Sequence, residues 1–204
     1  MAPKPDVSEE RKQQILEAAS EVFSQKGFDN ARMEDIAEQT GLSKGSLYLY
    51  FKSKDDLITS ILDLAFQREF KQIENLDASE MSATEALEKI VDLALEDFAG
   101  MLRLLPVAYE FLALAFRNRV VQKALKEYFN RYMNVMVPVV QRGIDSGEFR
   151  AVDAKQVAIA TGAILEGTIL LWVYDKSLVN PEQHIRTGIQ LLLEGLQAPP
   201  ARQA

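Results

Sequence analysis

Residues 41 to 57, GLSKGSLYLYFKSKDDL, carry side chains suited to binding a polyanion. The stretch contains three lysines and two tyrosines, and no acidic residue occurs from Gln39 until Asp55. Ammonium and hydroxyl groups bind phosphate oxygens, and lysine can also bind a guanine edge. The whole chain is acidic, with 30 acidic and 23 basic residues. A local surface free of carboxylates therefore predicts binding to nucleic acid, because a carboxylate there would be pushed against phosphate.

The same inventory argues against an enzyme. The sequence has no cysteine and one histidine, and it lacks a P-loop, a glycine-rich dinucleotide fingerprint and an HExxH motif. We expect no metal site, no catalytic residue and no cofactor. His184, near the start of a predicted helix, is interpreted as a surface residue. A purely structural or protein-binding helical bundle is the other alternative, and salt-sensitive binding to specific DNA would separate both alternatives from the favoured one.

Two short helices position the acid-free stretch. A first helix is predicted over about 8 to 26, with Gly27 at its end. RMEDIAEQ then forms a helix that stops at Gly41, and Ser43 caps a second one, KGSLYLYF. Buried apolar residues lock the crossing, and this arrangement predicts a helix-turn-helix. The outward residues of its second helix are Lys44, Gly45, Ser46, Tyr48, Leu49 and Tyr50.

A third helix is predicted to begin at Ser53, where Asp56 completes a capping-box pattern. Lys54 adds a cation at this helix start, where backbone amides already favour an anion. The helix continues far beyond the small domain and would couple it stiffly to a larger one.

The second half also follows a helical period, and no alternating strand pattern occurs. Ser82 and Glu85 predict a capping box before a helix that reaches Leu102, and Pro106 is expected to begin a short apolar segment ending at Phe116. A long helix is predicted over about 120 to 146. Asp153 and Asn180 are candidate caps for the last two helices. The fold class is therefore all-α.

Residues 157 to 173, VAIATGAILEGTILLWV, are apolar but short for a membrane span and contain Glu166, so we expect a buried helix. Ala154, Ala158, Gly162 and Glu166 recur every four residues, which favours a close helix–helix contact, either between subunits or within one. Glu166 is either an ordinary interface carboxylate or a group that binds a cationic ligand. The polar N-terminus lacks an apolar signal segment, and we expect a cytoplasmic protein without a membrane partner.

Over about residues 8 to 62 the sequence resembles the TetR (tetracycline-repressor-like) family of transcriptional regulators. The resemblance rests on VFSQKGF and on DIAEQTGLSKGSLYLYFKSKDDL. It implies DNA-contact roles for Lys44, Gly45, Ser46, Tyr48, Tyr50 and Lys54, to which we add Leu49 and Arg32. Many members have a Ser or Thr that caps the second helix and holds a phosphate where this chain has Arg32, so that contact is either replaced by the guanidinium or lost. The resemblance also implies that the last two helices form a dimeric four-helix bundle.

The predicted organisation is an N-terminal arm at 1–7, a three-helix DNA-binding domain at 8–53, a larger helical ligand-binding and dimerisation domain at 54–196, and a disordered tail at 197–204. The predicted function is a ligand-responsive regulator, a repressor that a small apolar molecule releases from a palindromic DNA operator. Aromatic side chains can enclose an apolar cavity for this effector. The candidate lining residues are Leu62, Phe66, Leu95, Phe98, Tyr109, Tyr128, Tyr132, Glu166 and Trp172.

Overall fold

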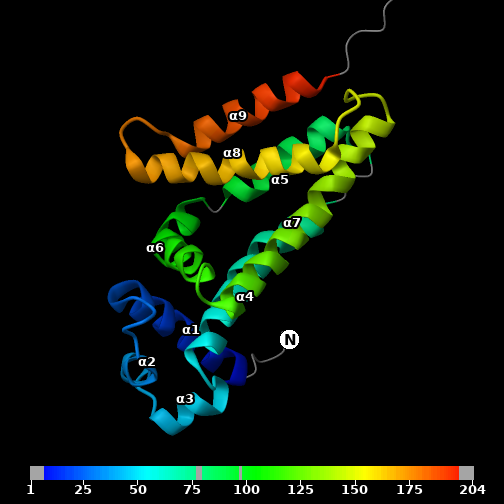
Figure 1. The fold of residues 1–204 in the computed structure, drawn as a ribbon. Coiled ribbons are helices and arrows are strands. Elements are labelled where there is room, and N and C mark those ends of the chain that lie inside the picture. Colours follow the sequence, from blue (N-terminus) through cyan, green and yellow to red (C-terminus); the bar gives the residue numbers. More distant parts are fainter. Residues whose placement is uncertain (1–6, 77–79, 97, 198–204) are drawn as a thin grey trace, which may run out of the picture. The chain divides into compact units, whose positions relative to one another are not determined.

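The computed structural model describes residues 7–76, 80–96 and 98–197, and the regular elements within them are helices (Figure 1). The only β-type pairing among these residues is an isolated bridge between Phe149 and Gln197. The all-α prediction is confirmed. The predicted arm at 1–7, apart from Val7, and the tail beyond Gln197 lie outside the described residues. The helices are α1 Val7–Lys26, α2 Met33–Thr40, α3 Lys44–Tyr50, α4 Lys54–Glu74, α5 Ala83–Glu96, α6 Phe98–Ala115, α7 Arg119–Asp145, α8 Ala154–Tyr174 and α9 Pro181–Leu196.

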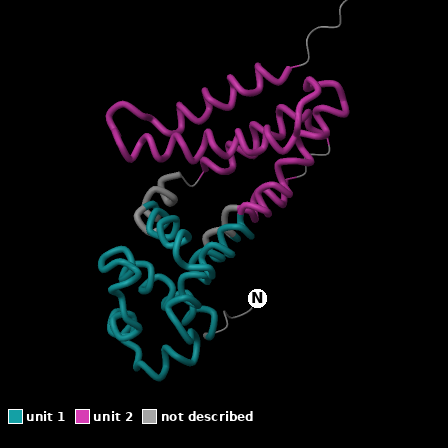
Figure 2. Tube along the Cα trace, viewed as in Figure 1, with its two compact units in different colours: residues 1–68, 99–128 teal, residues 69–98, 129–204 magenta. Residues whose placement is uncertain are grey.

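The chain divides into two compact units, coloured separately in Figure 2. Unit 1 comprises residues 1–68 and 99–128, and unit 2 comprises 69–98 and 129–204. The predicted DNA-binding segment 8–53 therefore lies in one compact unit with the first part of α4, most of α6 and the start of α7. A functional boundary at residue 53 stays a prediction.

A single apolar core holds unit 1 together. Residues of α1, α2 and α3 share it with side chains of α4, α6 and α7, including Leu57, Phe111 and Val121. Phe23 and Phe28 add a tilted ring pair with centroids 5.3 Å apart. The positions of α2 and α3 are thus fixed by residues far along the chain as well as by their neighbours.

The predicted caps are present. Ser43, Asp153 and Asn180 accept hydrogen bonds from backbone N–H groups at the starts of α3, α8 and α9. The Ser82–Glu85 capping box is complete, with the Ser82 N–H donating to Glu85 Oε2 at 2.9 Å and the Glu85 N–H donating to Ser82 Oγ at 3.1 Å.

The boundary between α5 and α6 was predicted wrongly. The sequence pattern indicated one helix reaching Leu102 and a new segment at Pro106, whereas α5 ends at Glu96 and α6 runs from Phe98 through Pro106 to Ala115. Neither glycine nor proline marks the break in the sequence. Beyond the proline, α6 buries Phe111 and Leu114, so tertiary packing outweighs the helix-breaking tendency of proline.

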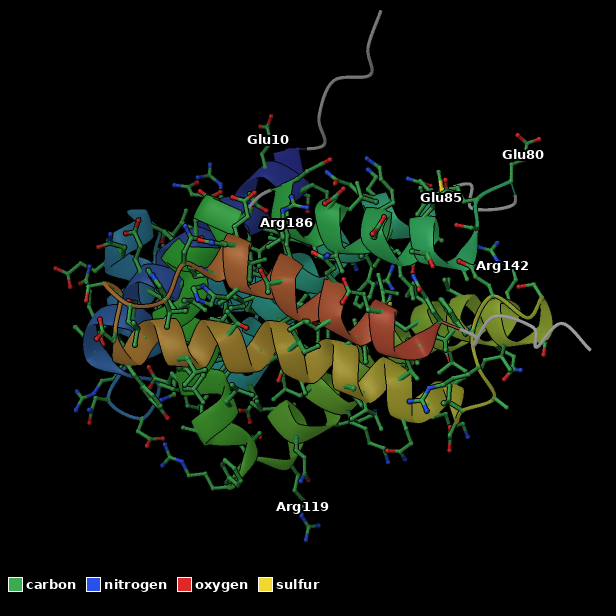
Figure 3. The ribbon with its side chains drawn as sticks, turned by 90° about the horizontal axis from the view of Figure 1, so that it is seen from above. Glu10, Glu80, Glu85, Arg119, Arg142 and Arg186 are labelled. Carbon is green, nitrogen blue, oxygen red and sulfur yellow. The ribbon has the colours of Figure 1, made fainter. Side chains whose placement is uncertain are left out.

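In unit 2, α8 packs along α9, and α5 contacts α9 (Figure 1). Figure 3 labels Arg186 on α9, whose guanidinium pairs with Asp92 of α5. The small residues of α8 face α7 of the same subunit. Ala154 and Ala158 are buried, and a Cβ added at Gly162 would lie 3.2 Å from the Tyr132 hydroxyl oxygen. Ala158 and Gly162 of the stripe therefore make a contact within one subunit, through Tyr132 of α7, whereas Glu166 is exposed.

The expectation of a buried helix at 157–173 is only partly met. Helix α8 is long and apolar enough to cross a membrane, and 17% of its most apolar window is buried within the chain. Burial is concentrated in its first half, at Ala154, Val157, Ala158 and Thr161. The exposed apolar residues of α8 include Ile159, Leu170, Leu171 and Val173.

Candidate nucleic-acid interface

Helix α3 is held rigidly, so its outward face is well defined. Leu47 is fully buried on its inner side. The turn before it is closed by Gly41, whose φ of 69° is in the left-handed region, and by the Leu42 N–H, which donates to the Ala37 carbonyl at 3.0 Å. The Ser43 hydroxyl accepts the Ser46 N–H at 3.1 Å. These contacts fix both the start of α3 and its rotation about its own axis.

The six candidate residues of α3 fall into two groups. Lys44, Gly45, Tyr48 and Leu49 are exposed on one face. Ser46 is half-buried, with its hydroxyl 2.8 Å from that of Ser43, and Tyr50 packs partly against the core of unit 1. The geometry thus offers four outward positions for direct contact with a partner.

Lys44 forms an ion pair with an acidic residue of α2, which the sequence did not indicate. Its ammonium forms a hydrogen-bonded ion pair with Glu34 of α2, and it lies 5.9 Å from the centroid of the Tyr48 ring. The hydrogen bond raises the pKa of Lys44 and lowers the pKa of Glu34. Both groups are exposed, so a phosphate can compete for the ammonium.

Lys54 contacts the turn between α1 and α2. Its ammonium donates to the carbonyl oxygens of Phe28 at 2.5 Å and Asp29 at 3.2 Å, and lies 4.6 Å from the centroid of the Phe28 ring. The ammonium is therefore solvated by protein groups, while its charge is not paired with a carboxylate in these contacts. Phosphate binding by Lys54 remains a prediction, and a phosphate would have to compete with these two carbonyl oxygens for the ammonium.

Arg32 precedes α2, and its backbone N–H donates to Asp35 Oδ2 at 2.9 Å. The side chain is exposed, and across residues 7–76, 80–96 and 98–197 it has no hydrogen bond or ion pair assigned to its guanidinium. The location at the positive end of a helix suits an anion. A phosphate contact by Arg32 stays a prediction.

The turn between α1 and α2 is also contacted by α6 and by the segment that joins it to α7, a feature that sequence reasoning missed. The Glu110 carboxylate accepts the Phe28 N–H, and Arg117 forms an ion pair with Asp29 at 2.6 Å. Asn118 then donates to Asp55 of α4 at 2.8 Å. These are polar contacts between residues distant in sequence, and no local pattern signals them.

The candidate lining residues for an effector are divided between the two units. Leu62, Tyr109 and Tyr128 belong to unit 1, and Leu62 is part of its core. Leu95, Tyr132, Glu166 and Trp172 belong to unit 2. The side chains of Phe66 and Phe98 lie outside the described residues. An effector site lined by these residues stays a prediction.

Within unit 2, Tyr132 is held by α8 and by its neighbour on α7. The Tyr132 hydroxyl donates to the Ala158 carbonyl at 2.8 Å, and the Tyr132 ring stacks with Phe129 at a centroid distance of 6.2 Å. Burial raises the pKa of Tyr132, and loss of solvation raises the pKa of the Glu166 carboxyl. Trp172 is half-buried, with the Lys176 ammonium 4.6 Å from its ring centroid. In the described part of the chain, no three His, Asp or Glu side chains gather to hold a metal ion.

Two family models match most of the chain. Residues 15–61 match the model described as bacterial regulatory proteins, tetR family, and residues 83–196 match the BetI-type transcriptional repressor C-terminal model. The uncharacterized HTH-type transcriptional regulator YfiR of Bacillus subtilis is 30% identical over 74% of this chain and 75% of its own length. The fatty acid metabolism regulator protein of B. subtilis is 25% identical over 90% of this chain and 94% of its own. The crystal structure of the B. subtilis regulator FadR in complex with stearoyl-CoA superposes with a TM-score of 0.77 at 26% identity, covering 91% of this chain and 99% of that one.

Proposed function

The chain belongs to the TetR family of bacterial regulatory proteins, and from this premise we propose that it is a cytoplasmic homodimer released from a palindromic operator by a long-chain acyl thioester. Membership makes it a ligand-responsive, DNA-binding transcriptional regulator of the repressor type. The identity of the effector, the symmetry of the operator and the dimer are the parts that we propose.

The observation that carries DNA binding is the outward face of α3. Lys44, Gly45, Tyr48 and Leu49 are exposed there, on a helix whose other side is locked by the buried Leu47. The helix lies within the segment matched by the tetR family model. In a helix-turn-helix the second helix enters the major groove, so the side chains of Lys44, Tyr48 and Leu49 and the backbone at Gly45 are assigned to base edges and nearby phosphates.

The exposed apolar surface of α8 and α9 supports the dimer. Ile159 and Leu170 are exposed on α8, and Leu191 of α9 is 63% exposed. These residues lie on helices that run side by side (Figure 1). An apolar helix exposed in a single chain is a candidate for coverage by another protein or by a membrane. We assign the cover to a second copy, which makes two recognition helices available about 34–36 Å apart for one operator.

Relatives support the acyl effector. A B. subtilis relative is named a fatty acid metabolism regulator, and the FadR structure contains stearoyl-CoA. In this chain, residues 98–116 read FAGMLRLLPVAYEFLALAF, with one arginine and one glutamate as their only charged residues. Such a segment suits contact with an acyl chain.

A DNA-release assay tests the proposal. Operator DNA is first selected from random duplexes with the wild-type protein, and its affinity is then measured by fluorescence anisotropy while stearoyl-CoA is added. We expect operator affinity to fall about 5- to 150-fold. Free CoA is the control ligand that lacks the acyl chain. Choline is the control ligand that tests whether Glu166 binds a cation. Release by choline and not by stearoyl-CoA would overturn the acyl assignment.

The single tryptophan provides an independent readout of binding. A change in Trp172 emission with stearoyl-CoA would report an effect in unit 2 even if DNA were absent. Linkage requires bound operator to weaken stearoyl-CoA binding by the same factor that stearoyl-CoA weakens operator binding. Saturable stearoyl-CoA binding that leaves DNA affinity unchanged would contradict the regulatory role of that ligand.

A further inference from the structure

Gly45 lies on the outward face of α3, and nothing in the fold requires a glycine at this position. A Cβ added there would meet only the Ser43 hydroxyl oxygen, at 4.0 Å. Its φ is not in the left-handed region, in contrast to those of Gly27, Gly41 and Gly147. Glycine is less favourable than alanine within a helix. The missing side chain leaves the backbone of α3 uncovered on its outward face.

Leu49 follows four residues later, so it lies beside Gly45 on the same ridge of the helix. It is 85% exposed, whereas Leu47 on the opposite side is fully buried. Leu49 thus contributes little to the core of unit 1. We call the uncovered backbone at Gly45 together with the neighbouring Leu49 side chain the Gly45–Leu49 notch, which lies on the face that carries Lys44 and Tyr48.

We propose that this Gly45–Leu49 notch reads thymine, with the C5-methyl group placed over the Gly45 backbone and against the Leu49 side chain. The inference rests on the proposed DNA binding by α3 and names one element of its specificity. Thymine is the base that presents a methyl group in the major groove, and apolar side chains read it by contact. Leu49 has no polar side-chain group with which to bind a phosphate or the hydrogen-bonding edge of a base.

The test removes the methyl group from DNA and the apolar wall from the protein. Each thymine of the selected operator is replaced in turn by deoxyuridine, which lacks only the C5-methyl group. For wild-type protein, we expect one thymine position per half-site to lose affinity by about fourfold, the value of burying about one methyl-sized group. Leu49→Ala should bind the thymine and deoxyuridine operators equally. Tyr48→Phe, which retains the notch, should keep the deoxyuridine effect.

Gly45→Ala tests the gap separately from folding. Alanine favours the helix, so the melting temperature should not fall, while operator affinity should decrease because the added methyl group occupies the notch. If Gly45→Ala binds the operator as tightly as the wild type does, the idea that DNA occupies the space beside Gly45 is refuted. Deoxyuridine sensitivity that is absent at every thymine, or that is unchanged in Leu49→Ala, would refute thymine reading. A wild-type protein that selects no DNA sequence would instead refute the proposed function.

Discussion

Replacing Lys54 with alanine should destabilise the protein more than it alters the salt dependence of DNA binding. The Lys54 ammonium is held by the carbonyl oxygens of Phe28 and Asp29, at 2.5 and 3.2 Å, and lies 4.6 Å from the Phe28 ring centroid. The substitution removes all three contacts. It should therefore loosen the attachment of α4 to the turn between α1 and α2.

The size of the effect follows from these contacts. Hydrogen bonds to a charged group contribute about 1.5–3 kcal/mol when well formed. An exposed cation–π contact adds about 0.5–1 kcal/mol. Because the site is only partly buried and both carbonyls can rebind water, we expect the free energy of unfolding to fall by about 1–2 kcal/mol. For a chain of this length, that change lowers the melting temperature by about 2–8 °C.

Lys52 provides the matched control, because it lies two residues earlier in the same acid-free stretch. Its side chain is exposed, and the structure assigns its ammonium no hydrogen bond or ion pair with any described residue. Lys52→Ala should leave the melting temperature unchanged and, if the ammonium neutralises one phosphate, reduce the magnitude of the salt slope by about 0.9. If the Lys54 ammonium stays on the Phe28 and Asp29 carbonyls in the complex, Lys54→Ala should change the salt slope less than Lys52→Ala does.

Thermal unfolding followed by circular dichroism, together with operator titrations at four salt concentrations, separates the two roles of Lys54. An unchanged melting temperature combined with a salt slope reduced by about one would refute the stabilising contact of Lys54 with the turn between α1 and α2. That result would show that the ammonium leaves the Phe28 and Asp29 carbonyls for a phosphate in the complex.

Three further substitutions test other parts of the account. Arg32→Ala should weaken binding to all DNA sequences and reduce the salt slope by about one without lowering the melting temperature, as operator titration and thermal unfolding will check. Gly162→Leu should clash with Tyr132 and lower the free energy of unfolding by about 1–3 kcal/mol, whereas Leu191→Glu should instead convert a dimer into monomers in sedimentation experiments. Glu166→Gln should make the protein more stable than the wild type at pH 8, with little difference between the two proteins at pH 4. The pKa of Glu166 is raised in the folded chain, so stability falls as pH rises above the unfolded value, and melting temperatures across this range will test whether the variant lacks that fall.

The local signals of the first 60 residues predicted their structure well. Gly27 and Gly41 have the positive φ expected of helix-ending glycines, and Ser43 caps α3. Such features depend on nearest neighbours in the chain, so the sequence contains them directly. The acid-free run likewise identified the exposed face of α3, although it did not reveal the pairing of Lys44 with Glu34.

Contacts between distant residues could not be predicted in the same way. Spacing alone indicated a helix contact along Ala158 and Gly162 but not its partner, which is Tyr132 of α7. Periodicity also extended the predicted α5 helix past Glu96, because Phe98 and Leu102 continue the apolar register and the residue between α5 and α6 is neither glycine nor proline. Glu110 gave no signal at all, since a carboxylate that binds a backbone N–H across 82 positions resembles any surface glutamate.

The most direct test of the central claim is selection of binding sites from random duplex DNA with the full-length protein. A homodimer that places α3 of each subunit in successive major grooves should recover a sequence with two-fold symmetry, its half-sites centred about one helical turn apart or a multiple of that distance. Binding to that sequence should weaken steeply as salt increases. Enrichment of a single asymmetric half-site, or no enrichment at low salt, would contradict the account.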